Sequence, residues 1–320
     1  MLIAGVVPHL EVWGGVRRYL EIGNAMVDAG HQYHLYVLNP GDPWIPFKGE
    51  ILPYEEHKKY HHDIVFSGAS DCMGMLEEIE AGCRVIMVVS RSYKEKYLDI
   101  WRKHEREYVW VGANHGWRGQ FDGELVGGFT VPGGVNAKFF KPNYSRRGKG
   151  IRVSYYCRSQ TISCLYQTEE AIKKFVSDYK PGWEFFGYDK QLPGYKADAI
   201  TFAACHSQFD LLELLQSSHL VLSLKEGGIW NNNIVEGMAC GCAAICKAHE
   251  ANSFFEAGKT GRIAVDDIEL YGCLVDFYKH PDWLIECGKN AHDVIQDYSW
   301  EIYCRKLLEV IEVWKSQRFQ

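Results

Sequence analysis

The sequence predicts an α/β protein of two domains, each built on a parallel sheet. Short apolar strands alternate with helix-length amphipathic segments, and the same alternation starts again after residues 141–150, a basic stretch with proline and glycine. Alternation of this kind favours parallel sheets covered by helices on both faces. The 320 residues are enough for two domains of ordinary size.

The first half begins with a continuous apolar run at residues 1–7, as expected of a strand that is buried on both faces. Apolar residues recur at helical spacing over residues 16–27, and Gly30 provides a helix stop. Further strands are expected within residues 33–38, 63–68, 84–90 and 108–113.

The second half repeats this pattern. Strands are expected at residues 151–157, 183–189 and 220–224, and helices at residues 168–179 and 208–218. We therefore expect an N-terminal domain at 1–142 and a C-terminal domain at 143–300, followed by a helix at 301–320 that returns toward the first domain. A cleft between two such domains is a preferred place for a ligand.

Composition excludes some classes of protein. Apolar residues make up 47% and charged residues 24% of the chain, and the formal net charge is −6. A dedicated nucleic-acid binder would be basic, and no apolar stretch is long enough to span a bilayer. The N-terminus is typical of a strand rather than a signal peptide. The eleven cysteines lack zinc-like spacing, so we expect buried free thiols in a reducing cytoplasm.

Residues 226–246 carry the densest polar pattern. Glu226 follows the strand at 220–224, and Gly227 and Gly228 let backbone amides approach a ligand closely. A helix expected to start near Asn233 would offer an anion site at its N-terminus. The alternative for Glu236 is a capping box with Asn233, which needs no ligand. Capping does not explain Glu226, because this residue precedes the turn.

Five segments in order resemble the family-4 retaining glycosyltransferases of GT-B fold. The strongest is "SLKEGGIWNNNIVEGMACGCAAI", which is similar to the family's pattern of Glu, Gly-rich turn and second Glu. The others are "EVWGGVRRYLEIGNAMVDAGH", "TVPGGVNAKFFKP", "FEAGKTGRIAVDD" and "YSWEIYCRKLLEVIE". The resemblance implies two Rossmann-like domains whose parallel sheets face each other across a cleft.

The same resemblance assigns site residues. Glu226 would bind sugar hydroxyls and Arg158 the phosphate, and these two are the catalytic candidates. The donor-binding candidates, which surround the nucleotide, diphosphate and sugar, are Gly14, Gly15, Tyr188, Gly227, Gly228, Ile229, Trp230, Asn231 and Glu236. Within this set, Glu236 would hold the ribose and Tyr188 would lie near the base.

Retaining transfer in this family implies no protein nucleophile, no covalently bound cofactor and no metal. The leaving phosphate takes the acceptor proton, and a UDP- or GDP-sugar is the expected donor. Two departures leave alternatives open. Glu226 and Glu236 are separated by nine residues, more than the family pattern has, and no Lys follows Arg158 closely. A degenerate domain that binds sugar nucleotide without turnover, an epimerase and a phosphorylase are the rival hypotheses.

The identity of the acceptor is left open by the sequence. Ser90, Arg91 and His115 are the acceptor-side candidates, because the family has a His near the first two. Arg17 and Arg18 are expected to be solvated helix charges, with contact to an anionic acceptor as the alternative. The histidines within residues 57–62 are expected to form a solvated run. Small molecules, lipid-linked saccharides, polymers and nucleic acid remain possible acceptors, and charges within residues 91–107 leave peripheral membrane contact open.

Overall fold

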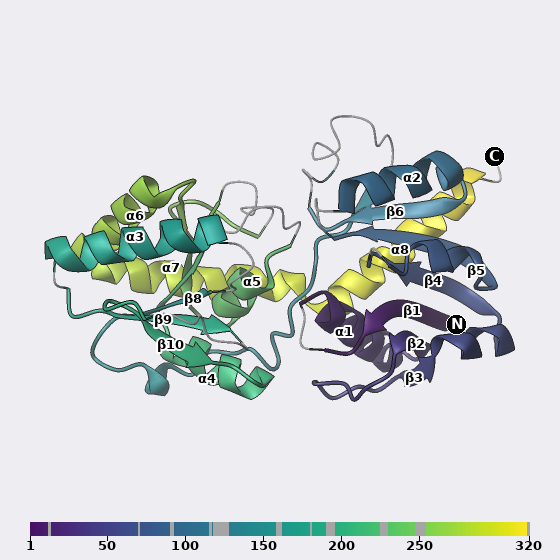
Figure 1. Ribbon diagram of the computed structural model, residues 1–320, viewed down its shortest axis with the longest axis horizontal. Helices are drawn as coiled ribbons and strands as arrows, with labels where there is room; N and C mark the ends of the chain where they lie inside the picture. Colours follow the sequence, from purple (N-terminus) through teal and green to yellow (C-terminus); the bar gives the residue numbers. More distant parts are fainter. Residues whose placement is uncertain are drawn as a thin grey trace. The chain divides into compact units, whose positions relative to one another are not determined.

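The computed structural model divides into two compact units (Figure 1). The first contains Met1–Gly134, Gly227–Trp230 and Ser299–Gln320, and the second contains Val135–Glu226 and Asn231–Tyr298. The structure describes residues 1–11, 14–69, 71–89, 93–114, 117, 128–157, 162–179, 181–189, 196–224, 230–247 and 254–318. For residues 14 and 162–166 it describes the backbone alone.

Among the described residues, the first unit contains a sheet of seven parallel strands in the order β3-β2-β1-β4-β5-β6-β7. These strands are β1 (Leu2–His9), β2 (Gln32–Asn39), β3 (Glu50–Pro53), β4 (His62–Ser67), β5 (Ala81–Val88), β6 (Tyr108–Gly112) and β7 (Phe129–Thr130). The order changes direction between β1 and β4. Open α/β sheets bind ligands beyond the carboxyl ends of the strands at such a switch point.

The core of the first unit lies between one face of this sheet and two helices, α1 (Gly14–Asp28) and α8 (Trp300–Arg318), which contact each other (Figure 1). Leu20 of α1 and Leu307 and Ile311 of α8 are fully buried in it. Gly30 has φ +85°, and its N–H donates to the carbonyl of Val27 (2.9 Å), which confirms the predicted helix stop. The other helices that the structure describes in this unit are α2 (Lys94–His104), η1 (Tyr54–Lys59) and η2 (Gly74–Glu77).

The described part of the second unit contains six parallel strands in the order β10-β9-β8-β11-β12-β13. They are β8 (Arg152–Tyr156), β9 (Glu184–Asp189), β10 (Thr201–Ala204), β11 (Leu220–Ser223), β12 (Ala243–Cys246) and β13 (Gly261–Ile263). Here the order changes direction between β8 and β11. The helices are α3 (Ile162–Tyr179), α4 (Gln208–Ser217), α5 (Asn232–Ala239), α6 (Asp267–Lys279), α7 (Pro281–Ile295), η5 (Tyr144–Arg146) and η6 (Gln296–Tyr298).

The core of the second unit packs α3, α6 and α7 against buried residues of β8, β9, β11 and β12. Phe175 of α3 and Phe277 of α6 are fully buried there. Helix α5 packs on β11 and β12, and a Cβ atom at Gly237 would collide with the Val221 side chain. This glycine therefore lets α5 approach β11 closely. The two parallel α/β sheets confirm the predicted fold class.

Residues 135–142 belong to the second unit by their contacts. The N–H of Val135 donates to the carbonyl of Tyr298 (2.8 Å), and Phe139 packs edge-on against Phe209 of α4. The roles assigned to the two predicted domains remain predictions. Strands β3, β7, β10, β12 and β13 were not expected, because runs of two to four residues show little periodic pattern.

Two expectations about charged and polar side chains are wrong. His57 and His62 are buried rather than solvated, with 2% and 0% exposure. The η1 turn directs His57 inward, where its Nδ1 bonds the carbonyl of Tyr54 (2.7 Å), and His62 Nε2 bonds the hydroxyl of Tyr36 (3.1 Å). The partner of His57 lies in the same turn, whereas Tyr36 lies on another strand, so the local sequence does not reveal the burial of His62. His61 is exposed, as expected.

Arg17 and Arg18 are buried too, with 5% and 7% exposure. They lie in the first two turns of α1, where Val16, Tyr19 and Leu20 are also buried. Other parts of the protein cover this end of the helix on its polar face as well as on its apolar face. The amphipathic pattern therefore wrongly predicted that the two arginines are exposed. The Arg17 guanidinium lies over the ring of Trp44, 4.6 Å from its centroid.

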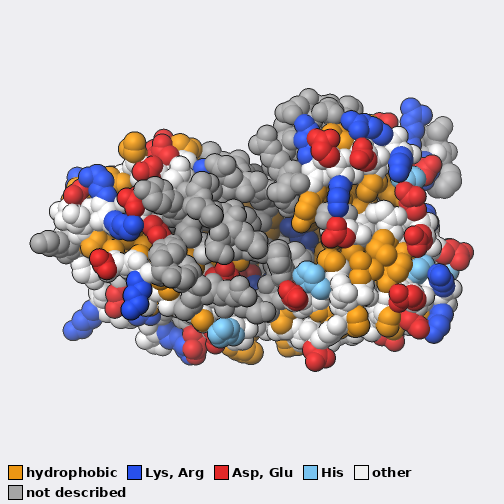
Figure 2. Space-filling view, viewed as in Figure 1, with side chains coloured by type: hydrophobic (Ala, Val, Ile, Leu, Met, Phe, Trp, Pro, Cys, Tyr) orange, Lys and Arg blue, Asp and Glu red, His pale blue; other side chains and the backbone are white. Residues whose placement is uncertain are grey.

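Surface charges of both signs are interspersed over the described surface in the space-filling view (Figure 2). On α2, Lys96 pairs with Asp71 (3.1 Å) and Arg102 with Asp99 (3.2 Å). These pairs balance part of the positive charge in residues 91–107. Within the described ranges, no helix has both the length and the apolar character needed to cross a bilayer.

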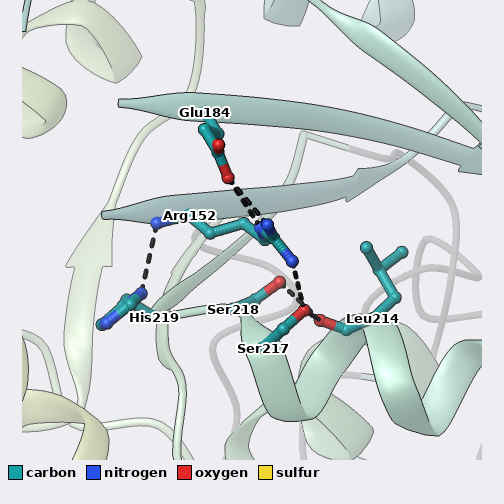
Figure 3. Close-up of polar contacts among 6 residues, drawn as sticks. All are labelled: Arg152, Glu184, Leu214, Ser217, Ser218 and His219. Carbon is teal, nitrogen blue, oxygen red and sulfur yellow. Dashed lines mark hydrogen bonds and ion pairs between the residues drawn. The ribbon is translucent and has the colours of Figure 1, made fainter. Parts of the chain in front are cut away.

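At the amino ends of β8 and β11, Arg152 connects three elements (Figure 3). Its guanidinium donates to Glu184 of β9 (2.8 and 3.0 Å) and to Ser217 Oγ at the end of α4 (2.9 Å). Its backbone N–H donates to His219 Nδ1 (3.2 Å). Burial, together with the positive charges of Arg147 and Arg152, lowers the pKa of His219 from 6.5 to about 4.

We predict that acid destabilises the fold through His219. Because its folded pKa lies below 6.5, the unfolded chain takes up this proton first, so stability is complete above pH 6.5 and falls toward pH 4. The loss is up to roughly 3 kcal/mol for this one residue. Urea unfolding at a series of pH values measures it.

His219→Asn keeps an acceptor without a titrating ring and should flatten this part of the pH profile. His61→Asn is the matched control, because the His61 side chain is 64% exposed. An unchanged acid slope in His219→Asn would contradict the assignment.

Candidate functional site

The predicted catalytic residues follow, in the sequence, the two strands at the topological switch point of the second sheet. Arg158 comes two residues after β8 and Glu226 three residues after β11, and these two strands are neighbours. Both residues lie outside the described part of the chain, as do Gly227, Gly228 and Ile229. Their strands nevertheless lead to one edge of the sheet, where a ligand is expected.

Asn231 joins the end of β11 to the start of α5. It is the N-cap residue of α5, but its side-chain amide donates to Ser223 Oγ (2.7 Å) instead of capping the helix. The predicted capping box of Asn233 and Glu236 is therefore wrong, because the helix starts at Asn232. The first turn of α5 contains no acidic residue. A helix N-terminus without an acidic side chain in its first turn favours the binding of an anion.

Glu236 is a buried carboxylate on α5, with 3% exposure. Tyr188, near the carboxyl end of β9, is also 3% exposed. Burial first, and then the negative charge of Glu236, raises the pKa of Tyr188 well above its ordinary value. The fold thus brings these two predicted donor residues within electrostatic range, although they lie far apart in the sequence. The ring of Tyr156, at the end of β8, lies 5.8 Å from that of Tyr188.

This arrangement can accept paired hydroxyl groups. An ionised carboxylate is an acceptor only and can take hydrogen bonds at both oxygens. Tyr188 stays neutral because its pKa is raised, so its hydroxyl remains able to donate. A buried acceptor beside a helix N-terminus suits a molecule with a vicinal diol near an anionic group.

Lys247 was missed by the sequence analysis. It follows β12 directly and is only 7% exposed, and lysines are seldom buried unless they are paired. β12 neighbours β11, with Cys246 opposite Ser223, so Lys247 lies at the edge of the sheet where β11 ends. The sequence signal that could have identified Lys247 is its position directly after the apolar run "AAIC".

In the first unit, Gly14 and Gly15 are the first residues of α1. A Cβ at Gly15 would meet no atom of the described residues within 4 Å. Trp230 belongs to this unit by its contacts, and its ring would collide with a Cβ at Gly133. Ser90, Arg91 and His115 lie outside the described residues.

Metal binding finds no support in the described ranges. No group of three or more His, Cys, Asp or Glu side chains there could hold a metal ion. The cysteines that the structure describes are free thiols, and all except Cys205 are buried. Burial raises the pKa of Cys157, at the end of β8, to about 12, so this thiol stays protonated.

Comparison with known proteins supports a sugar-transfer family. Residues 167–309 match the family described as "Glycosyl transferase-like". This segment covers most of the second unit, including α5, and continues into α8. No curated protein matches the chain.

Solved structures with the same fold are glycosyltransferases. Sucrose-phosphate synthase from Thermosynechococcus elongatus has TM-score 0.79 and 15% identity, and 99% of each chain is covered. HepE from Anabaena in complex with UDP and glucose has TM-score 0.75 and 12% identity, with 98% of this chain and 100% of HepE covered. A glycosyltransferase from Rickettsia africae has TM-score 0.70 and 16% identity, with 98% of each chain covered.

These identities are low, so the similarity of structure shows the fold alone. The family match covers residues 167–309, which include the helix that carries Glu236. These residues are therefore similar to the glycosyl transferase-like family, and the whole chain has the fold of the solved structures named above.

Proposed function

We propose that the chain is a retaining glycosyltransferase that moves a sugar from a nucleotide-sugar to an acceptor without a metal ion. The observation that supports this most is the buried pair of Glu236 and Tyr188 beside the start of α5. A diol acceptor next to an anion site matches the ribose and diphosphate of a nucleoside diphosphate.

The donor is held mainly by the second unit in this proposal, and residues 227–230, which belong to the first unit by their contacts, add to the lining of the sugar and diphosphate. Glu236 accepts from the ribose hydroxyls, the amides at the start of α5 face the diphosphate, and Tyr188 lies near the base. Gly227, Gly228, Ile229, Trp230 and Asn231 line the sugar and diphosphate. HepE, which shares the fold, has been solved with UDP and UDP-glucose, which favours a UDP-sugar over a GDP-sugar.

Lys247 supplies the cation that the sequence pattern lacks after Arg158. Its position beyond β12 places it one strand from the exit of β11, and a buried ammonium is strongly attracted to a diphosphate. Arg158 contacts the phosphate from the other side of the switch point. Together they stabilise the charge that develops when the glycosidic bond to the leaving diphosphate breaks.

In the proposed chemistry, no protein side chain has to act as a nucleophile or as one of a paired acid and base. Glu226 binds sugar hydroxyls and orients the donor, and the leaving phosphate takes the proton of the attacking acceptor. Attack occurs on the face from which the diphosphate departs, so the anomeric configuration is retained. Positioning and charge stabilisation are then the main contributions of the protein.

Residues 1–142 form the acceptor domain and residues 143–300 the donor domain in this proposal. Ser90, Arg91 and His115 lie on the acceptor side, and Gly14 and Gly15 close over the diphosphate or the acceptor. We place the enzyme in the cytoplasm, where nucleotide-sugars are made and buried thiols stay reduced. A second function, sugar-nucleotide binding without turnover, is favoured by the lengthened segment between Glu226 and Glu236.

We predict that the chain binds UDP and discriminates against 2′-deoxy-UDP by about tenfold, because loss of one hydroxyl removes a hydrogen bond to the buried Glu236 side chain. Isothermal titration calorimetry measures both affinities. Glu236→Gln should weaken UDP binding by about tenfold or more and should reduce the discrimination.

Glu286→Gln is the matched control, because Glu286 is an exposed residue of α7. If Glu236→Gln preserved the full preference for UDP over the deoxynucleotide, Glu236 would not be the ribose ligand. The affinity for GDP, measured in the same assay and compared with that for UDP, decides which nucleobase the site prefers.

We predict that Glu226→Ala lowers sugar transfer and slow donor hydrolysis by at least about a hundredfold, while UDP affinity changes by less than about threefold. The reason is that Glu226 contacts the sugar and not the nucleotide. Release of UDP from UDP-glucose measures hydrolysis, and calorimetry measures binding.

Wild-type protein that binds UDP-glucose but releases no UDP in the presence of any acceptor tested would favour the binding function without turnover. A fully active Glu226→Ala variant would remove Glu226 from the site.

A further inference from the structure

We propose that Arg147 is a positioning residue for the donor site: it holds the carboxyl end of α5 and thereby fixes the carboxylate of Glu236. This inference rests on the proposed function, because Arg147 acts on the nucleotide only through Glu236. It depends on three features: the hydrogen bonds at the end of α5, the close packing around that end, and the short path from there to Glu236.

The backbone itself forms two of the hydrogen bonds at the end of α5. Gly241 has φ +80°, and its N–H donates to the carbonyl of Met238 (2.9 Å). The next N–H, that of Cys242, donates to the carbonyl of Gly237 (3.0 Å). This is the Schellman arrangement, in which a left-handed glycine ends a helix. Because a helix leaves its last four carbonyls without partners of its own, two carbonyls still need donors.

Side chains from two other elements bond these two carbonyls. The guanidinium of Arg147 donates from Nη2 to the carbonyl of Cys240 (3.0 Å). Nδ1 of His292, on α7, bonds the carbonyl of Ala239 (2.9 Å). Arg147 directly follows η5 and comes from the basic stretch 141–150. The hydrogen bonds at the end of α5 are therefore complete only when these two distant segments contact it.

Close packing holds the end of α5 from two sides. Helices α5 and α7 lie side by side (Figure 1), and a Cβ at Gly288 of α7 would collide with the carbonyl oxygen of Gly241. A Cβ at Gly241 would lie 2.9 Å from the hydroxyl of Tyr144. The Arg147 guanidinium lies over the ring of Tyr144, 4.8 Å from its centroid. Arg147 is thus held by an aromatic ring that packs against the same turn.

The charge of Arg147 adds to its hydrogen bond. The carboxyl end of a helix carries a partial negative charge, which a cation stabilises. The last turn of α5 contains no basic residue of its own, and a guanidinium stays protonated at physiological pH. Arg147 therefore brings the complementary charge from outside the helix.

Glu236 lies one turn before this end of the helix. Its backbone carbonyl accepts from the N–H of Cys240 (3.1 Å), and the carbonyl of Cys240 accepts from Arg147. With eight residues, α5 is too short to be stable without its tertiary contacts. Loss of the Arg147 bond would loosen the last turn, and the carboxylate of Glu236 would lose its fixed position relative to the ribose.

The test measures the preference for UDP over 2′-deoxy-UDP by isothermal titration calorimetry, at a temperature at which every variant is folded. Arg147→Met keeps the length of the side chain but has no donor and no charge. It should weaken UDP binding by about tenfold and lower the preference for UDP to less than about threefold, because Glu236 is no longer positioned to accept from the ribose.

Arg152→Met is the matched control. Arg152 also connects elements of the second unit through its guanidinium (Figure 3), and it lies over the ring of Phe186, 4.7 Å from its centroid. Its described side-chain partners, Glu184 and Ser217, do not belong to α5. This variant should lose stability but keep the wild-type preference for UDP, so it separates positioning from a general loss of stability.

A double-mutant cycle tests whether Arg147 acts through Glu236. In the Glu236→Gln background, Arg147→Met should weaken UDP binding by less than about threefold, because the group that Arg147 positions is already changed. In the wild-type background the same substitution should weaken it by about tenfold.

Three results would overturn the proposal: an unchanged preference for UDP in Arg147→Met, an equal loss of preference in Arg152→Met, or a full tenfold effect of Arg147→Met in the Glu236→Gln background. If Arg147→Met does not fold, Arg147→Gln, which removes the charge and shortens the side chain, replaces it with the same expected outcome. The proposed function fails separately, since wild-type protein that binds no nucleoside diphosphate would remove the site that Arg147 serves. A wild-type preference that Arg147→Met leaves intact contradicts the positioning role alone.

Discussion

The close packing of α5 on β11 is the constraint on which the donor site depends. Gly237 has no side chain, and a Cβ there would collide with Val221. The helix therefore lies close to the sheet and carries Glu236 into the interior, where its charge reaches Tyr188 on β9. Any larger residue at position 237 would displace the helix and move the carboxylate away from the strand edge.

This packing explains why the site can be both charged and stable. A buried carboxylate is costly unless other groups satisfy it. The parallel sheet provides such groups at one edge, because the carboxyl ends of β8, β9, β11 and β12 are neighbours.

The sequence predicted the parts of the fold that depend on local pattern. Continuous apolar runs identified β1, β8 and β11, and Gly30 marked the end of α1 because the next turn requires a positive φ. The order of five motifs pointed to the GT-B class. The fold is confirmed by the two sheets, and the family match over residues 167–309 supports the glycosyltransferase class.

Long-range partners could not be predicted. The Asn233 cap was wrong because Asn231 bonds Ser223 across the turn, a contact that sequence spacing does not encode. Arg17, Arg18, His57 and His62 were expected in solvent because they are polar, yet other elements cover them. Burial of a polar residue depends on the elements that pack around it, and single-sequence periodicity reports only its own helix or strand.

The central claim is that a nucleoside diphosphate binds at the start of α5. Hydrogen exchange of the full-length protein, followed by mass spectrometry with and without UDP, tests it most directly. The account predicts slower exchange for the amides in the first turn of α5, with no change in α4, whose N-terminus is already capped by Ser207 and Asp210. Unchanged exchange in α5 at saturating UDP, or protection confined to the first unit, would contradict the account.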